Sequence, residues 1–278
     1  MTKKKILIPT DFSKASSDSL RYGCELAVKI GADVEVLHVV YPEVETSDLP
    51  MIAAHATQER VRTARELVRN VMENHSSLFK GSDCTYNTHI EVGMPVSVIT
   101  QVARRDLVYT ILIGTAQKHF GIEKLFGSTT TGVIEKSSGN VLVVPEGSEF
   151  SDIKTVAYAT DLLASDPYQI WKAIHWLEPF RPVLHVVHFS PDPKMEDKKK
   201  FDQLKSYFES QNSSMQTFAH YVSGEDLRRS LDKFVRKNDI ELLIMYKPQR
   251  NFLQKMFHQS QTKSMALHTH KPLLVVKE

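Results

Sequence analysis

The chain has 278 residues, of which 35 are basic and 33 acidic, for a formal net charge of +2. So balanced a charge provides no strong positive field, and we expect no binding to nucleic acid or to a membrane surface. Hydrophobic residues make up 41% and charged residues 24% of the chain, which is typical of a globular protein and excludes the disordered and fibrous classes.

The N-terminal segment carries three lysines, residues 3–5, before the short apolar run Ile6–Ile8, which ends at Pro9. An export signal needs an apolar run of about seven residues or more, and no window approaches the roughly 18 apolar residues of a membrane span. The two cysteines, Cys24 and Cys84, lie far apart and form no metal-binding or disulfide pattern. We therefore expect a protein of the reducing cytoplasm.

Short apolar strands and helical stretches alternate through the first half of the chain. The predicted strands are residues 4–9, 33–40, 85–91, 110–113 and 141–144. The predicted helices are residues 14–30, 57–78, 95–106 and 128–137. This alternation predicts an α/β domain with a parallel sheet covered by helices. The strands are continuously apolar, as expected for strands that are buried on both faces.

The second half repeats the order of the first. Residues 6–11 are matched by residues 156–161, an offset of 161 − 11 = 150. The sequence Leu-His-Val-Val at 37–40 recurs at 184–187, an offset of 184 − 37 = 147. Offsets that shrink along the chain predict shorter loops in the second copy. Both tryptophans, Trp171 and Trp176, are expected in the core of that copy.

A linker separates the two copies. Residues 145–152 combine proline, glycine, serine and acidic side chains, a composition typical of interdomain segments. We therefore predict two domains, residues 1–147 and residues 152–278.

Small and polar residues follow the first and fourth predicted strands. The first strand leads into Pro9-Thr10-Asp11, the fourth ends on Ile113-Gly114, and a later helix opens with Gly127-Ser128-Thr129-Thr130. A helix N-terminus has unpaired N–H groups and a partial positive charge, so this opening is suited to a phosphate. Neighbouring first and fourth strands would bring these residues to one crevice. The alternative is that Gly114 and Gly127 only shape a tight turn.

These residues carry a family resemblance. Their order, together with Leu37-His38-Val39-Val40 and the strand 141–145, resembles a universal stress protein domain, whose ATP-binding members share the motif Gly-x2-Gly-x9-Gly-Ser/Thr. The resemblance covers nearly the whole chain as two tandem domains. It implies two doubly wound α/β domains of the adenine nucleotide alpha hydrolase-like type, each with a five-stranded parallel sheet in the order 3-2-1-4-5 and helices on both faces. It also implies that the two domains pair through their last strands as an internal pseudo-dimer. Further homodimerisation is expected because a short apolar edge such as residues 273–276 tends to be covered.

The resemblance implies an ATP site in the first domain, with or without Mg²⁺. Asp11 and Val39 would contact adenine and ribose, and Ile113 and Gly114 the ribose. The phosphates would bind Gly127, Ser128, Thr129 and Thr130. Gln117 stands where the motif has its second glycine, and a side chain there opposes close approach of a phosphate.

The second copy departs further from the motif. Tyr246, Gln249 and Gln259 replace its three glycines, and only Asp161 and Ser260 remain. We therefore expect a nucleotide-binding module of the stress response, with its site in the first domain and an unknown protein partner. The alternative is a nucleotide-free scaffold. No nucleophile–base pair and no metal-binding spacing is present, so we expect neither catalysis nor a bound metal centre, with slow ATP hydrolysis as a weaker alternative.

Overall fold

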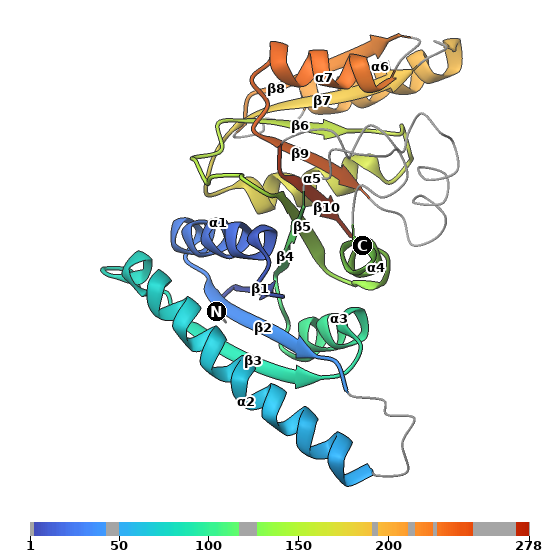
Figure 1. The fold of residues 1–278 in the computed structure, drawn as a ribbon. Coiled ribbons are helices and arrows are strands. Elements are labelled where there is room, and N and C mark those ends of the chain that lie inside the picture. Colours follow the sequence, from blue (N-terminus) through green and yellow to red (C-terminus); the bar gives the residue numbers. More distant parts are fainter. Residues whose placement is uncertain are drawn as a thin grey trace. The chain divides into compact units, whose positions relative to one another are not determined.

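The structure is a computed structural model that describes residues 3–42, 50–116, 127–190, 194–210, 215–224, 227–246 and 271–277 (Figure 1). These residues form two compact units. Unit 1 holds the described residues up to 150, and unit 2 holds those from 151 onward. The predicted domain bounds, 1–147 and 152–278, remain a proposal.

Unit 1 is a five-stranded parallel sheet in the order β3-β2-β1-β4-β5. Its strands are β1 (Lys5–Pro9), β2 (Asp33–Val40), β3 (Tyr86–Val92), β4 (Thr110–Thr115) and β5 (Asn140–Pro145). Its helices are α1 (Lys14–Ile30), α2 (Pro50–His75), α3 (Pro95–Arg105) and α4 (Ser128–Lys136), with a short 3₁₀ turn at Ser76–Phe79. The doubly wound α/β fold predicted from the sequence is confirmed.

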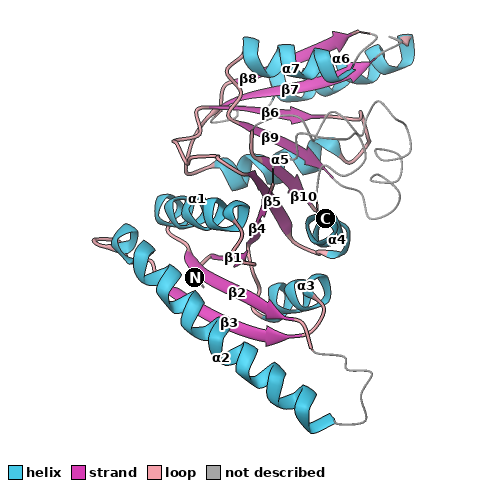
Figure 2. Cartoon of the chain, in the orientation of Figure 1, coloured by secondary structure: helices cyan, strands magenta, loops and turns pink. Residues whose placement is uncertain are grey.

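Helices cover both faces of this sheet. Because parallel crossovers are right-handed, α1 and α2 lie on one face and α3 and α4 on the other. Figures 1 and 2 show α2 and α3 on opposite sides of β2 and β3. Ser13 caps α1 by accepting a hydrogen bond from the Ser16 amide, and Gly31 ends the helix in the left-handed conformation, as predicted. Helix α2 begins at Pro50, earlier than predicted, because proline suits the first turn of a helix.

Unit 2 repeats the sheet in the order β10-β9-β6-β7-β8, again with parallel neighbours. Its strands are β6 (Thr155–Ala159), β7 (Val183–Ser190), β8 (Thr217–Ser223), β9 (Leu242–Tyr246) and β10 (Leu273–Val276). Its described helices are α5 (Asp166–Leu177), α6 (Met195–Ser210) and α7 (Leu227–Lys237). Phe234 of α7 contacts His185 of β7, whereas Phe201 of α6 contacts Tyr221 of β8 on the other face.

The structure corrects the register of the repeat. His38 Nδ1 lies 2.8 Å from the Thr10 carbonyl oxygen, and His188 Nδ1 lies 2.8 Å from the Thr160 carbonyl oxygen. The second strands are therefore related by 188 − 38 = 150, not by 147. The predicted match of His38 with His185 was wrong because the same four letters, Leu-His-Val-Val, occur three residues earlier in β7.

The corrected register places two polar pairs at equivalent positions. In unit 1, the buried carboxylate of Glu35 lies 2.6 Å from His89 Nε2 and 3.2 Å from Lys5 Nζ. In unit 2, the positions of Glu35 and His89 hold His185 and His220, whose Nδ1 and Nε2 atoms are 2.8 Å apart. Equivalent positions of the two sheets thus hold a carboxylate–imidazole pair in unit 1 and a pair of imidazoles in unit 2.

Helix α5 carries both tryptophans. Trp176 is buried as predicted, but Trp171 is 58% exposed, so its predicted place in the core was wrong. The rings of Tyr168, Trp171 and His175 lie nearly parallel along the exposed side of the helix. Within the described residues, no helix combines the length and apolarity that a membrane crossing requires.

Candidate functional site

The chain turns sharply where β1 ends. The Thr10 amide donates to the Leu37 carbonyl oxygen at 2.9 Å, and its buried hydroxyl lies 3.1 Å from the Ser16 hydroxyl. The same hydroxyl accepts a hydrogen bond from the Phe12 amide at 3.2 Å. Phe12 has φ 62°, a left-handed conformation that a side-chain-bearing residue adopts only when its surroundings hold it there. This corner directs Asp11 outward.

Asp11 is exposed at the carboxyl end of β1, and its Oδ1 accepts a hydrogen bond from the Ser13 amide at 3.0 Å. Partial burial acts to raise the pKa of Asp11. Hydrogen bonds from Ser13 and Ser16 together outweigh it and hold the pKa below its ordinary value. Asp11 is therefore an anionic hydrogen-bond acceptor at neutral pH, suited to hydroxyl and amino groups of a ligand.

Asp11 and Val39 line one cavity of about 550 Å³. The cavity lies between the carboxyl ends of β1 and β2 and the side of α2. Phe12 and His38 form one wall, with ring centroids 4.5 Å apart. The remaining lining residues are Val40, Tyr41, Glu59, Arg60, Thr63, Ala64 and Leu67. The structure thus brings together the two residues predicted to contact a base and ribose, and adds a wall from α2.

Ile113 and Gly114 lie near the carboxyl end of β4, the strand next to β1. The Ile113 side chain is buried, so only its backbone could face a ligand. A Cβ on Gly114 would lie 2.3 Å from the Ala15 carbonyl oxygen and 2.9 Å from Ser19 Oγ. Gly114 is therefore required for the close packing of α1 on β4, which supports the structural alternative for this glycine.

Gly127 differs from Gly114. It precedes α4 with φ −58° and ψ 158°, angles open to other residues, and beyond its two chain neighbours no atom of the described residues lies within 4 Å of the place where its Cβ would be. Neither packing nor backbone angle therefore requires glycine here. The close approach of a ligand to the backbone would still explain a glycine at this position.

Helix α4 begins beside the end of β4. The buried Thr130 hydroxyl donates to the Gly114 carbonyl oxygen at 3.5 Å, while Ser128 is exposed and Thr129 is half-buried. The first amides of α4 therefore lie next to the carboxyl end of β4, and the phosphate site stays a prediction. The Thr130 side chain points inward, which leaves Ser128 and Thr129 as the accessible hydroxyls. Gln117 lies outside the described residues.

The predicted residues thus form two groups at the start of α1. Asp11 and Val39 share the cavity, and Gly114 and Thr130 join β4 to α4. Pro9 is buried at the end of β1, and Thr10 shapes the corner.

Among the residues that the structure describes, no three histidine, cysteine or acidic side chains gather closely enough to hold a metal ion. The α2 lining was not predicted, because an amphipathic helix gives no sign of what it faces.

Unit 2 keeps the corner after its first strand but not the glycine of the fourth strand. The Leu162 amide donates to the Thr160 hydroxyl at 2.9 Å, and Leu162 has φ 57°. Tyr246, 5% exposed, occupies the position of Gly114. Asp166, at the position of Ser16, accepts hydrogen bonds from the Thr160 hydroxyl and from the Leu163 amide. Burial raises the pKa of Asp166 despite these bonds.

An open, doubly wound parallel sheet with its polar corner and helix start at the switch point defines a Rossmann-like α/β protein. A sequence profile described as the Universal stress protein family matches residues 3–145, about half of the chain. The chain belongs to the universal stress protein family.

Two relatives from Methanocaldococcus jannaschii each match about half of the chain. Universal stress protein MJ0577 is 30% identical over 152 residues, which cover 51% of this chain and 94% of that protein. Universal stress protein MJ0531 is 27% identical over 143 residues, which cover 51% of this chain and 81% of that protein.

A solved structure extends the likeness in fold to both units. The universal stress protein from Archaeoglobus fulgidus DSM 4304 superposes with a TM-score of 0.71, covers 99% of this chain and 96% of its own, and is 19% identical. The fold of two such domains in tandem is therefore shared.

Proposed function

We propose that unit 1 is a module that binds ATP or a related adenine nucleotide in a cytoplasmic stress response. The single observation that supports this most is the cavity of about 550 Å³ that unites Asp11 and Val39 at the carboxyl ends of β1 and β2. Its size is within the usual range for small-molecule pockets, about 300 to 1,000 Å³.

The cavity is suited to the base and ribose. Val39, Phe12 and Leu67 offer apolar surface to a planar base, and the Asp11 carboxylate offers an acceptor for a ribose hydroxyl or an exocyclic amino group. Because hydrogen bonds hold the pKa of Asp11 low, this acceptor is fully ionised at neutral pH.

The start of α4 is suited to the phosphates. Gly127 leaves room for an anion, and the first amides of α4 and the Ser128 and Thr129 hydroxyls supply donors. In this proposal Thr130 positions the helix through its bond to Gly114 and does not touch the ligand. We assign no residue to Mg²⁺, and we propose binding without turnover, since no described side chain pairs with Asp11 as a nucleophile or base.

The rival proposal is a scaffold that binds no nucleotide and acts through a protein partner, as a homodimer or as a pseudo-dimer of its domains. The sequence of unit 2 favours this role, because Tyr246, Gln249 and Gln259 replace the three glycines of the nucleotide-binding motif there. We therefore assign nucleotide binding to unit 1 alone.

Calorimetry with Mg-ATP tests the proposal. We expect one site per chain, a loss of about tenfold in affinity for Asp11→Asn, because the amide replaces an anionic acceptor, and no change for the matched variant Asp161→Asn in unit 2. Absence of heat and of thermal stabilisation with ATP, ADP and AMP would establish the scaffold instead. Nucleotide released on denaturation of the purified protein would exclude that scaffold.

A further inference from the structure

Strand β3 is the terminal strand of the unit 1 sheet. The Val34 amide donates to the Thr85 carbonyl oxygen, and the Gly93 amide donates to the Val40 carbonyl oxygen. In a parallel ladder the residues of a strand alternate in the side to which their backbone groups point. Odd-numbered residues of β3 therefore bond to β2, and the backbone groups of Tyr86, Thr88 and Ile90 point away from the sheet.

No partner for these outward backbone groups lies within the described part of the chain. Thr88 is exposed, and Val92, at the end of the strand, is 46% exposed. A row of unpaired N–H and C=O groups is a template for another strand. The edge carries neither a proline nor a bulge, the usual means of blocking such pairing.

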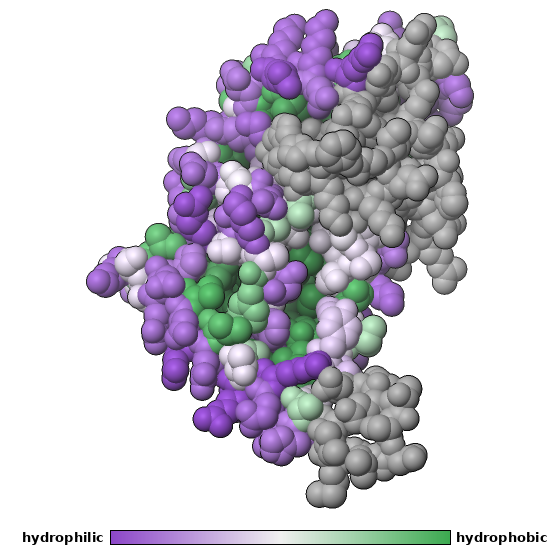
Figure 3. All heavy atoms as spheres, in the orientation of Figure 1, coloured by the Kyte–Doolittle hydropathy of each residue, from purple (hydrophilic) through white to green (hydrophobic). Residues whose placement is uncertain are grey.

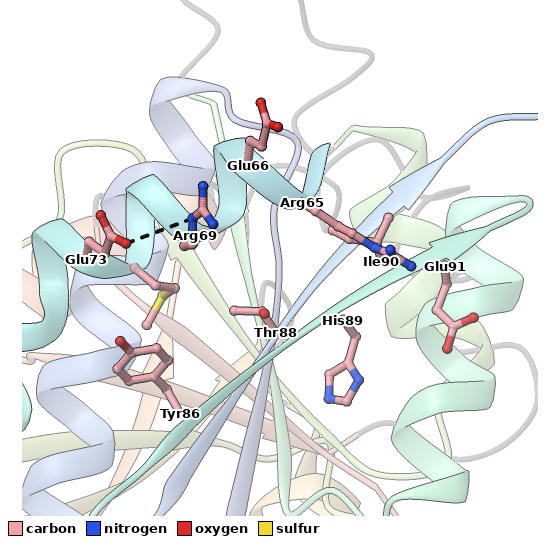
Figure 4. Close-up of a pocket in the computed structure, with 10 residues that line it drawn as sticks. Arg65, Glu66, Arg69, Glu73, Tyr86, Thr88, His89, Ile90 and Glu91 are labelled. Carbon is pink, nitrogen blue, oxygen red and sulfur yellow. Dashed lines mark ion pairs between the residues drawn. The ribbon is translucent and has the colours of Figure 1, made fainter. Parts of the chain in front are cut away.

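Helix α2 forms a wall beside this edge. Between them lies a groove of about 530 Å³, which we call the α2–β3 groove. Figure 4 shows Thr88 in the middle of the groove, Tyr86 at one end and Ile90 at the other, with Arg65 of α2 extending toward Ile90. The exposed side of α2 is hydrophilic (Figure 3). An added strand would place every second side chain in this groove.

The charges that line the groove are unevenly paired. Glu66 lies 4.0 Å from Arg62, Glu73 lies 3.9 Å from Arg69, and Glu91 lies 3.3 Å from Arg105. Each acidic side chain of the groove thus has a basic neighbour. Arg65 is exposed and has no ion-pair partner among the residues that the structure describes. The groove therefore offers one cation to a ligand.

We propose that the α2–β3 groove binds an extended polypeptide segment of a protein partner as an added strand on β3, with an acidic side chain of that segment on Arg65. The backbone groups of Tyr86, Thr88 and Ile90 provide the affinity, and Arg65 selects the charge. This surface is separate from the cavity at Asp11 and does not depend on nucleotide binding.

The test uses two fluorescent six-residue peptides of alternating threonine and valine, one with a central glutamate and one with a central lysine. Fluorescence anisotropy with the full chain is expected to show binding of the glutamate peptide about tenfold tighter than that of the lysine peptide. Arg65→Glu is expected to reverse this preference. Arg104→Glu, on α3 and therefore on the opposite face, is the matched control and should leave it unchanged.

Thr88→Pro tests the added strand itself. Proline removes the outward N–H of Thr88, which takes no part in the β2–β3 ladder, so the sheet is expected to remain intact while both peptides lose binding. Equal binding of the two peptides by the wild-type chain, or full binding by Thr88→Pro, would overturn the proposal. So would self-association that Thr88→Pro abolishes, because β3 would then pair with a second copy of this chain. Should Thr88→Pro fail to fold, Arg65→Glu still decides the outcome.

Discussion

His185 and His220 are joined by a 2.8 Å contact between Nδ1 and Nε2, at the strand positions that hold Glu35 and His89 in unit 1. In a hydrogen bond between two neutral imidazoles, one ring donates its N–H group and the other accepts through its unprotonated nitrogen. A protonated imidazole cannot accept a hydrogen bond, so acid works against the pair in unit 2.

Unit 2 is expected to lose stability as the pH falls below about 6.5. Burial and the neighbouring His220 lower the pKa of His185, and burial and Lys237 lower the pKa of His220. Below the ordinary histidine pKa of 6.5 the unfolded chain therefore binds more protons than the folded one, and the equilibrium shifts toward unfolding.

Hydrogen exchange near pH 7.5 and near pH 5.5, roughly one unit on either side of the ordinary histidine pKa, measures this effect strand by strand. Protection of β7 and β8 should fall relative to that of β2 and β3. His220→Phe should weaken the pH dependence, and equal loss of protection in both sheets would contradict the prediction.

Gly114→Ala is expected to destabilise unit 1 by about 1–3 kcal/mol, the usual range for an overpacked core. The reason is the 2.3 Å approach that the new Cβ would make to the Ala15 carbonyl oxygen, a backbone atom that cannot move aside freely. Urea denaturation provides the measurement. Gly127→Ala serves as the control and should change stability by less than about 0.5 kcal/mol, since its Cβ would meet no atom of the described residues other than its chain neighbours.

Tyr246→Gly is expected to destabilise unit 2 and not to create a nucleotide site. Removing a buried aromatic side chain leaves a cavity and lowers the free energy of unfolding by about 3–5 kcal/mol. Tyr246→Phe keeps the ring and should lower it by about 1 kcal/mol. Denaturant titration compares the two, and ATP binding acquired by the glycine variant in unit 2 would show that Tyr246 alone closes the pocket.

Gln117→Gly tests the departure from the nucleotide-binding motif. If the glutamine side chain opposes close approach of a phosphate, glycine should raise the affinity of unit 1 for ATP by about tenfold. The matched change in unit 2 is Gln249→Gly, for which no binding is expected. Calorimetric titration of both variants decides the matter, and equal affinities of the wild-type chain and Gln117→Gly would show that the glutamine is no obstacle.

The sequence was sufficient for the fold of unit 1 because β1, β2, β4 and β5 are short, largely apolar runs bounded by a turn residue or a cap, whereas β3 is polar and half-buried at the edge. Ser13 and Gly31 marked the ends of α1 correctly for this reason. The repeat register was harder to predict. Leu-His-Val-Val occurs twice by coincidence. The alignment follows from the register of the strands and from the contact of each histidine with the carbonyl oxygen after the first strand, His38 with Thr10 and His188 with Thr160.

Only the residues at the two ends of the candidate site, Asp11 and Gly127, could be predicted from the sequence. Asp11 follows an apolar strand, and Gly127 precedes a helix, so both are conspicuous in the sequence. The sequence could not separate the roles of the two glycines, because the 2.3 Å approach to Ala15 depends on how closely α1 packs against β4. Nor could it show that the Thr130 hydroxyl is turned toward Gly114 and away from a ligand.

Both tryptophans of the chain lie in α5, one buried and one exposed, and therefore both report on unit 2. Light that excites tryptophan but not tyrosine consequently follows the unfolding of unit 2 and is blind to that of unit 1. Any change in tryptophan emission when nucleotide is added would reveal energetic communication between the halves. A silent tryptophan signal beside a calorimetric response would instead show that each half of the molecule works alone.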